Sequence, residues 1–494
     1  MAVLTLNDEV RKFLNQQHAS VIDGSPVAEG QPHPVIDPAT EATIAQVLFA
    51  DAGTVDKAVQ SAHRAFRDGR WTGLRPADRE RILLDFASKV AEHAETLAQI
   101  ESLNQGKSIH VARMIDAGGS VEFMRYMAGW ATKIEGRTMD VSIAMPPGSR
   151  HTAYTRREPV GVVAGIVPWN FPLLIATWKL IPALAAGCTV VLKPSPETPL
   201  TALYLAQLAL QAGIPPGVFN LVPGGVETGQ ALVAHPLVRK ITFTGSTAAG
   251  RKVGISALEN MARFTLELGG KNPMVVLEDA DIGAAVQGAL LGGLTNSGQV
   301  CAAASRFYVH RSRHQAFVEA LAAAVAGMKV GPGLDPEANA NPVVSRRQQQ
   351  SIGRQLERAR QEGARVLAGG GLVDQPGFYV QPTVLDGVNH QMAIAREEIF
   401  GPVLAVIPFD DDEQALAMAN DSDYGLGASL WTNDLRKAMN LVPRIEAGTV
   451  WVNTHVLIDP AMPFGGVKQS GIGREFGGAA VESFTELKSV CIAH

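Results

Sequence analysis

Cysteine, long runs of one charge and uninterrupted apolar segments are all scarce in this sequence of 494 residues. Its three cysteines, Cys188, Cys301 and Cys491, are odd in number and far apart. They predict neither a disulfide framework nor a zinc site, and they suit a reducing compartment. The net charge of −5 is spread along the chain, so nothing favours nucleic acid or an anionic membrane as a partner. The twelve histidines form no metal-binding motif, and we predict no metal.

A targeting or membrane segment is not predicted either. Four charged residues lie between positions 8 and 12, where a signal peptide would need an apolar run. The most apolar stretch, residues 161–187, is long enough to raise the question of a membrane span. It is interrupted by Pro168, Asn170, Pro172, Lys179 and Pro182. We therefore expect a cytoplasmic protein without a membrane partner.

The order of apolar segments predicts an α/β fold with two or three domains. From about residue 160, short apolar strands alternate with helices, which is typical of a parallel sheet covered on both faces. The expected strands are 161–167, 189–193, 218–222 and 240–244, and the expected helices are 173–187 and 200–213. A second α/β block is expected over about 267–460, and a single amphipathic helix over 76–105.

Residues 137–157 alternate polar and apolar side chains around the turn PPG, which predicts a two-stranded ribbon. The terminal segment 486–494 could add a third strand. Because an exposed ribbon leaves unpaired edges, we expect it to serve self-association.

Polar or glycine-rich residues follow the strands of the first block. Ligands of parallel sheets bind beyond the carboxyl ends of the strands, so Asn170, Lys193, Gly225 and Ser246 are expected to face one crevice. The stretch FTGSTAAGRKV (243–253) suits a pyrophosphate at a helix N-terminus, although a simple tight turn is equally consistent with it. Lys193 is either a solvated strand cap or a contact to a nucleotide ribose.

Two residues have the character of a reaction centre. Cys301 lies in GQVCAAASR (298–306), whose small neighbours leave room for a substrate, although free cysteines are usually small core residues. A thiolate there would need a helix N-terminus or a cation nearby. Glu267, in ELGGKNP, is either a surface carboxylate or a general base at a strand end. No histidine motif pairs with Cys301, which disfavours a papain-like protease, and His455 either lines a pocket or packs in the core.

Six motifs in this order resemble the NAD(P)-dependent aldehyde dehydrogenase superfamily. They are PWNFP (168–172), FTGST (243–247), ELGGKNP (267–273), the Cys301 stretch, EEIFGPV (397–403) and PFGGVKQSGIGRE (463–475). The resemblance implies a Rossmann-like parallel-sheet cofactor-binding domain over 1–136 and 158–266, and an α/β catalytic domain over 267–465. It also implies a β-ribbon oligomerisation element over 137–157 and 480–494, which builds a homotetramer.

The resemblance assigns a role to each catalytic position. Cys301 is expected to attack an aldehyde carbonyl, with the oxyanion held by the Asn170 amide and the Cys301 backbone N–H. A thiohemiacetal and then a thioester follow, and Glu267 activates the water that releases a free acid. Lys179 and Glu475 match a buried pair that relays protons from this base.

The cofactor expected from the resemblance is NAD. The positions that match cofactor contacts are Ile166, Trp169, Lys193, Ser195, Gly225, Gly245, Ser246, Glu398 and Phe400. Many NAD-preferring members have a glutamate three residues after the strand-end lysine. Here that position is Pro196, and Glu197 comes one residue later, so NADP is also possible.

The residues that match the family's aldehyde tunnel are apolar and partly aromatic. They are Phe171, Leu174, Trp178, Thr295, Val300, Ile458 and Phe464. The stretches 132–143, 451–466 and 486–491 resemble the bacterial phenylacetaldehyde dehydrogenases within the family, which implies phenylacetaldehyde as substrate. A broad preference for aliphatic or betaine-type aldehydes is the alternative. A non-catalytic nucleotide-binding homologue is disfavoured because both Cys301 and Glu267 are present.

Overall fold

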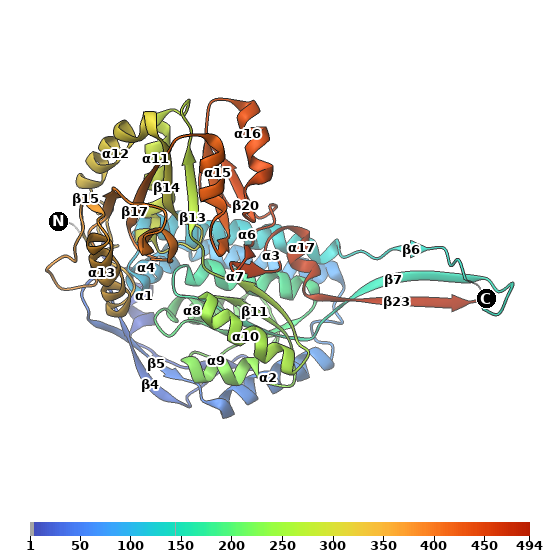
Figure 1. Ribbon diagram of the computed structural model, residues 1–494. Coiled ribbons are helices and arrows are strands. Elements are labelled where there is room, and N and C mark those ends of the chain that lie inside the picture. The colour runs from blue at the N-terminus through green and yellow to red at the C-terminus, as the bar shows by residue number, and fades with distance from the viewer. Residues whose placement is uncertain (1–3, 144) are drawn as a thin grey trace.

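Two large β-sheets and one projecting ribbon form the fold in the computed structural model, which describes residues 4–143 and 145–494 (Figure 1). The first sheet comes mainly from the N-terminal half of the chain, and the second from the C-terminal half. Helices cover both, so the predicted α/β class is confirmed.

The first sheet has eight strands, of which the central five run parallel. In spatial order they are β22 (Gly471–Ile472), β12 (Arg263–Glu267), β11 (Val238–Thr244), β8 (Val162–Ile166), β9 (Thr189–Lys193), β10 (Phe219–Leu221), β2 (Ser20–Ile22) and β3 (Ser25–Val27). The four strands predicted for this block are therefore all present, within one or two residues of their expected ends.

Helices cover the two faces of this sheet, as expected for apolar strands without alternation. One face packs against α7 (Pro172–Ala186) and α8 (Leu200–Gln211). The other packs against α2 (Ala52–Arg67), α9 (Val226–Val233) and α10 (Thr247–Glu259).

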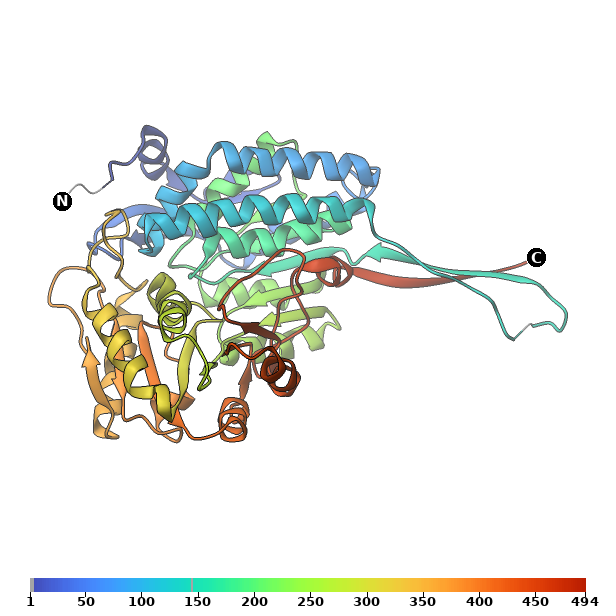
Figure 2. The ribbon, with the colours of Figure 1, turned by 90° about the horizontal axis from the view of Figure 1, so that it is seen from above.

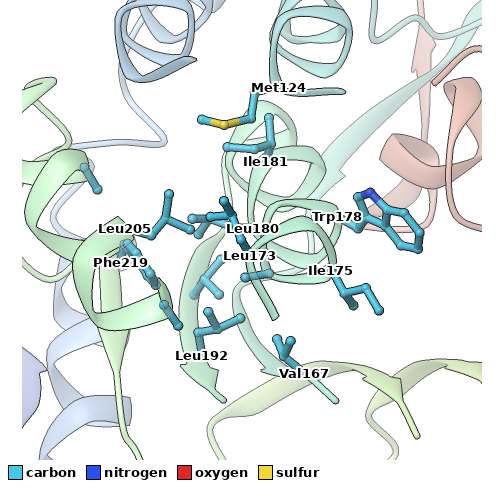
Figure 3. Packing of buried hydrophobic residues seen from close by; sticks show 14 of the residues in the cluster. Met124, Val167, Leu173, Ile175, Trp178, Leu180, Ile181, Leu192, Leu205 and Phe219 are labelled. Carbon is cyan, nitrogen blue, oxygen red and sulfur yellow. The ribbon is translucent and has the colours of Figure 1, made fainter. Parts of the chain in front are cut away.

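Helix α7 is the central helix of the core, and every one of its residues is buried. A helix that is apolar all round has no solvent face and must be enclosed by protein. Figure 3 shows Leu173, Leu180 and Ile181 directed into the packed cluster, while Trp178 lies to one side. The helix ends at Gly187, whose left-handed backbone (φ 95°) suits glycine. Among the described residues, no helix is both long and apolar enough to cross a membrane.

The single helix expected over 76–105 is instead two helices, α3 (Pro76–Glu92) and α4 (Ala94–Gln105). His93 leaves the helical conformation (φ −103°, ψ 17°), and its side chain contacts Tyr204 at 2.8 Å. The apolar period continues across this break, so it could not reveal the bend. Tertiary packing decides it, because α3 lies mainly on α6 (Gly119–Ala128) whereas α4 lies mainly on the π-helical segment Ala112–Gly118.

The second sheet has seven strands, all parallel except for one edge pair. In spatial order they are β15 (Arg365–Ala368), β16 (Thr383–Asp386), β17 (Val403–Phe409), β14 (Ala304–His310), β13 (Asn272–Val276), β19 (Gly427–Trp431) and β20 (Thr449–Val452). Helices α11 (Ile282–Leu294) and α12 (Arg311–Ala326) cover one face, and α13 (Arg346–Gln361) and α15 (Asp412–Asn420) the other.

A long ribbon projects from the body of the molecule (Figure 2). Its main pair is β7 (His151–Pro159) with the terminal strand β23 (Thr485–Ala493), which pair along nine residues of each. The partner expected around the PPG turn, β6, covers only Thr138 and Met139. The terminal strand β23, which the sequence suggested as a third strand, is thus the principal partner of β7. The described part of residues 140–150 is mostly irregular.

Candidate active site

The chain crosses from the first sheet to the second at ELGGKNP. Glu267 is the last residue of β12, and Asn272 is the first of β13. The connection from β12 to β13 is only four residues long (268–271), so the carboxyl end of β12 lies next to the start of β13. A Cβ at Gly269 would lie 2.2 Å from Glu398 Oε2, and one at Gly270 would lie 2.8 Å from the Cys301 carbonyl oxygen. Glycine is required at both positions because these neighbours leave no room for a side chain.

Cys301 lies in a tight loop between α11 and β14. Asn296, Ser297 and Gly298 adopt consecutive left-handed conformations (φ 51°, 54° and 69°), which costs free energy for the two non-glycine residues. Side-chain hydrogen bonds offset this cost: Asn296 Nδ2 donates to Asn170 O at 2.9 Å, and Ser297 Oγ donates to Asn341 O at 2.7 Å. The loop turns back on itself and leaves Cys301 half-buried.

Cys301 opens onto a cavity of about 260 Å³ between the two sheets. Asn170 lies in the same wall and donates one amide hydrogen to Gln299 O at 3.0 Å. Its second amide hydrogen has no acceptor within residues 4–143 and 145–494. Five of the predicted cofactor residues line this cavity: Trp169, Gly245, Ser246, Glu398 and Phe400. The rings of Trp169 and Phe400 meet edge to face at 5.1 Å. The Cys301 sulfur is therefore reachable from the cavity that the predicted cofactor residues line.

The remaining lining residues of the cavity include four that sequence reasoning missed. They are Arg347, Gln348, Ser351 and Gln355, all from α13. This helix is strongly polar and carries no recognisable motif, so no local signal could have marked it. It reaches the cavity only because the second sheet folds back toward the first.

The environment of the Cys301 thiol favours its neutral form. Burial raises the pKa of this thiol to about 12, and the Glu267 and Glu398 carboxylates act in the same direction. The backbone N–H groups of Ala302 and Cys301 lower it. A helix N-terminus or a cation beside the sulfur would favour a thiolate, but the charged groups that act on the pKa of this thiol are carboxylates. The resting group is a thiol, and the backbone N–H groups are what favour its thiolate.

Glu267 is almost fully buried, at 4% exposure, and neither of its carboxyl oxygens has a hydrogen-bond partner among the described residues. Burial raises the pKa of this carboxyl well above its usual range, and the nearby Glu475 adds to the shift. A carboxyl with a raised pKa beside an accessible thiol has the character of a general base.

Lys179 and Glu475 form a buried ion pair behind Glu267. Lys179 belongs to α7 and is fully buried, and Glu475 also lies 3.5 Å from the Thr242 hydroxyl. The Glu475 backbone pairs with that of Phe464 through two hydrogen bonds of 2.7 Å. Residues that are far apart in the sequence thus meet on one side of the Glu267 carboxyl.

The other predicted cofactor residues gather at the ends of β8, β9 and β10. Ile166 ends β8 and pairs with Lys193, the last residue of β9. Lys193 Nζ donates to Pro194 O and to Gly224 O, each at 2.7 Å. Ser195 Oγ donates to Glu197 Oε2 at 2.5 Å, and Gly225 precedes α9. These residues are not among those lining the Cys301 cavity, although they occupy the same edge of the sheet.

The predicted substrate residues fall into two groups. Phe171, Leu174, Trp178 and Phe464 are buried in one apolar cluster, against which Val300, Cys301 and Ile458 also pack. Thr295 is half-buried, and its hydroxyl donates to Leu291 O at 2.6 Å.

Two further aromatic residues belong to the same cluster and were missed. Phe476 lies 4.7 Å from the ring of Trp178 and 5.1 Å from that of Phe123. Phe476 follows the last family motif and has a positive φ of 68°, and Phe123 lies in an ordinary amphipathic helix. Neither position has a sequence signal of its own.

Comparisons with known proteins agree with this geometry. The profile of the Aldehyde dehydrogenase family matches residues 27–490. The chain is 46% identical to phenylacetaldehyde dehydrogenase of Pseudomonas fluorescens, over 93% of this chain and 92% of that protein. It is 41% identical to betaine aldehyde dehydrogenase of Cereibacter sphaeroides, over 95% of this chain and 96% of that protein. The NAD⁺ complex of an aldehyde dehydrogenase from Bacillus cereus superimposes with a TM-score of 0.96 at 43% identity, covering 99% of each chain.

Proposed function

Because the chain belongs to the aldehyde dehydrogenase family and is an NAD(P)-dependent oxidoreductase acting on aldehydes, we propose that it oxidises phenylacetaldehyde to phenylacetate through a thioester on Cys301. The observation that carries the proposal is the cavity that Cys301 shares with Asn170 and Glu398. In this cavity the Cys301 thiol lies in the same wall as the proposed oxyanion donor and opens toward the predicted cofactor residues. Glu267 is close enough to alter the pKa of the thiol.

The residues of this cavity fit a dinucleotide. Gly245 and Ser246 stand at the start of α10, where backbone N–H groups and the helix dipole favour a pyrophosphate. Gly225 has open space where a side chain would be, at the start of α9. Phe400 and Glu398, whose carboxylate raises the pKa of the Cys301 thiol, line the same cavity and would hold the nicotinamide end. When bound, the nicotinamide ring supplies the hydride acceptor.

The first chemical role belongs to Cys301. After the S–H proton has left, the thiolate that the neighbouring backbone N–H groups favour adds to the aldehyde carbon, and the carbonyl oxygen becomes an oxyanion. The free amide hydrogen of Asn170 and the Cys301 backbone N–H would then bind this oxyanion, since both donors are held in place before the reaction. Loss of hydride from the adduct leaves a thioester on Cys301.

The second role belongs to Glu267. Its raised pKa suits it to take a proton from the water that hydrolyses the thioester. The proton can pass on toward Glu475, whose Oε2 has no hydrogen-bond partner among the described residues. Lys179 holds the other side of this carboxylate in the ion pair. A free carboxylic acid is the product of this route.

The aromatic cluster supports an arylacetaldehyde as substrate. Trp178, Phe464 and Phe476 lie with ring centroids 4.7 to 6.4 Å apart, in tilted or edge-to-face geometry. Such faces favour a flat aromatic ring over a flexible alkyl chain. The 46% identity to a phenylacetaldehyde dehydrogenase points the same way, although the betaine aldehyde relative at 41% keeps a quaternary ammonium substrate as the second candidate.

We propose NAD as the preferred cofactor. Pro196 stands where many NAD-preferring members have a glutamate, and Glu197 supplies a carboxylate one residue later. Its side chain is half-buried and bonds to Ser195, two residues after the strand-end Lys193. A carboxylate there would bind ribose hydroxyls and repel a 2′-phosphate.

We further propose that residues 1–136 and 158–266 bind the cofactor, that residues 267–465 carry the catalytic chemistry, and that the ribbon (137–157 and 480–494) joins subunits into a homotetramer. The ribbon presents exposed apolar side chains to solvent: Met139, Ile143, Leu487 and Ile492. A projecting sheet with apolar edges needs a partner to be stable in water.

Replacing the nucleophile and the base should separate the two half-reactions. Cys301→Ser should lose dehydrogenase activity about a thousandfold or more. Glu267→Gln should still form the thioester, so stopped-flow absorbance should show a burst of reduced cofactor of about one equivalent per site, followed by slow turnover. Cys491→Ser, at an exposed cysteine, is the control and should be unchanged. An active Cys301→Ser enzyme would refute the covalent route, and a missing burst would refute the assigned base.

Substrate choice should appear in initial rates with three aldehydes. We expect the highest kcat/KM for phenylacetaldehyde, followed by hexanal and betaine aldehyde. Trp178→Ala should lower kcat/KM for phenylacetaldehyde about tenfold and that for hexanal less, because only the aryl substrate loses a ring contact. A tenfold preference of the unmodified enzyme for either of the other aldehydes would overturn this choice.

Cofactor preference should depend on Glu197. Glu197→Ser should raise the ratio of kcat/KM with NADP to kcat/KM with NAD about tenfold, because a charge that repels the 2′-phosphate is removed. Glu259→Ser, at the far end of α10, is the control for loss of one acidic residue. An unchanged ratio in Glu197→Ser would show that this carboxylate does not select the cofactor.

Assembly should depend on the ribbon. Sedimentation velocity should give about four times the mass of the chain. The double substitution Leu487→Asp and Ile492→Asp should produce smaller species. Leu435→Asp on α16 (Leu435–Leu441), which is also exposed but remote from the ribbon, should not. A monomeric unmodified protein would contradict the proposal.

A further inference from the structure

The backbone around Cys301 is held by hydrogen bonds at every carbonyl from residue 299 to residue 303. Asn170 holds the first carbonyl, and a turn hydrogen bond from Ala303 N to Val300 O holds the second. The other three are held by two side chains that the proposed mechanism does not use, Asn272 and His455.

Asn272 bridges two of these carbonyls. Its Nδ2 donates to Cys301 O at 2.8 Å and to Ala303 O at 2.9 Å, and its Oδ1 accepts from Gly427 N–H at 2.9 Å. The side chain is 2% exposed, and both amide hydrogens are used. The amide has one workable orientation, because the flipped one would face carbonyl oxygens with an oxygen.

His455 holds the carbonyl between them. Its Nε2 lies 3.0 Å from Ala302 O, which can only accept, so Nε2 carries the proton. Its Nδ1 then accepts from Ser429 Oγ at 2.8 Å, and that hydroxyl in turn accepts from the Trp431 indole N–H at 3.2 Å. The neutral tautomer is the form that satisfies the chain, and burial agrees, since it lowers the pKa of His455 to about 4.

Tight packing keeps both side chains in place. A Cβ at Gly292 would lie 2.6 Å from His455 Cδ2, and one at Gly270 would lie 2.7 Å from Asn272 Oδ1. The Trp451 ring lies 5.1 Å from the imidazole. The two glycines thus let the backbone pass close to both side chains.

The orientation of these carbonyls determines where the N–H groups point. In a trans peptide the C=O and N–H bonds point in opposite directions. Asn272 holds the carbonyl of the Cys301–Ala302 peptide, so the N–H of Ala302 is directed to the other side. The N–H groups of Ala302 and Cys301 are the groups that lower the pKa of the Cys301 thiol.

We propose that Asn272 and His455 are positioning residues for Cys301. Asn272 holds the Cys301–Ala302 peptide, so that the Ala302 N–H stays directed at the sulfur. His455 holds the Ala302–Ala303 peptide, whose N–H bonds to Val300 O and so fixes the peptide that carries the Cys301 N–H. We call these two side chains, with their hydrogen bonds to the carbonyls of residues 301–303, the clamp. Its functional meaning rests on the proposed role of Cys301 as the nucleophile. The clamp itself can be tested without aldehyde or cofactor, because it acts on the reactivity of the thiol.

The test is the pH dependence of Cys301 alkylation by iodoacetamide in the full chain. A Cys491→Ser background removes the exposed thiol, and Cys188 is fully buried. Asn272→Ala should lower the alkylation rate at about pH 8 roughly tenfold, because each unit of rise in the thiol pKa reduces the thiolate fraction about tenfold. His455→Phe should change it in the same direction. His455→Gln, which retains an amide donor for Ala302 O, should remain closer to the parent protein.

Two matched controls separate positioning from general loss of packing. Asn220 is equally buried and also joins two backbone groups, to Gly217 O at 2.7 Å and Asp23 N at 3.0 Å, but it lies in β10. His18 is a buried histidine remote from the cavity, at 4% exposure. Asn220→Ala and His18→Phe should leave the alkylation profile of Cys301 unchanged.

The outcomes are distinct. A profile unchanged in both Asn272→Ala and His455→Phe would overturn the clamp, and so would an equal shift in the two controls. If Asn272→Ala does not fold, as judged by thermal unfolding, the comparison of His455→Phe with His455→Gln decides, and equal profiles for these two would refute the proposal. Failure of the proposed function would appear separately, as dehydrogenase activity retained in Cys301→Ser.

Discussion

The crossing between the two sheets at residues 268–271 is the constraint on which the reaction centre depends. It joins the end of β12, where Glu267 stands, to the start of β13, where Asn272 holds the Cys301 loop. Two glycines make the crossing possible, because the Glu398 carboxylate and the Cys301 carbonyl occupy the space of any side chain there. Four residues of backbone thereby bring together the proposed base Glu267, the proposed nucleophile Cys301 and Asn272, which we propose orients it.

Burial at this crossing keeps the ionisable groups close to neutral at rest. It raises the pKa of the Cys301 thiol to about 12 and that of Glu398 to about 7, and it lowers the pKa of Lys271 to about 7. A charged group buried at this crossing costs free energy unless a hydrogen bond or an opposite charge stabilises it. The compensating groups are local and preorganised: backbone N–H groups beside the sulfur, the Asn170 amide, and the Lys179–Glu475 pair. The protein therefore stabilises charge at the atoms where it would develop during the reaction.

Helix α7 contributes both to the apolar core and to the polar centre. It supplies Trp178 to the aromatic cluster and Lys179 to the buried ion pair. Adjacent residues on a helix point about 100° apart. One helix can thus place one residue against an apolar wall and the next in the ion pair that we propose relays the proton.

The sequence by itself determined the α/β class, the strands that end at the cavity, and the family, because short-range periodicity and local motifs record which segments are buried and which turns are tight. Trp169, Gly245, Ser246, Glu398, Phe400 and Cys301 all follow such motifs, and they line one cavity. Tertiary structure alone decided the break at His93, the terminal strand as the main partner of β7, and the approach of α13 to the cavity. It alone also decided the packing of Phe123 and Phe476 against Trp178. It also decided that Asn272 and His455 hold the Cys301 loop. These features rest on contacts between residues far apart in the chain, whose partners leave no trace in the local pattern.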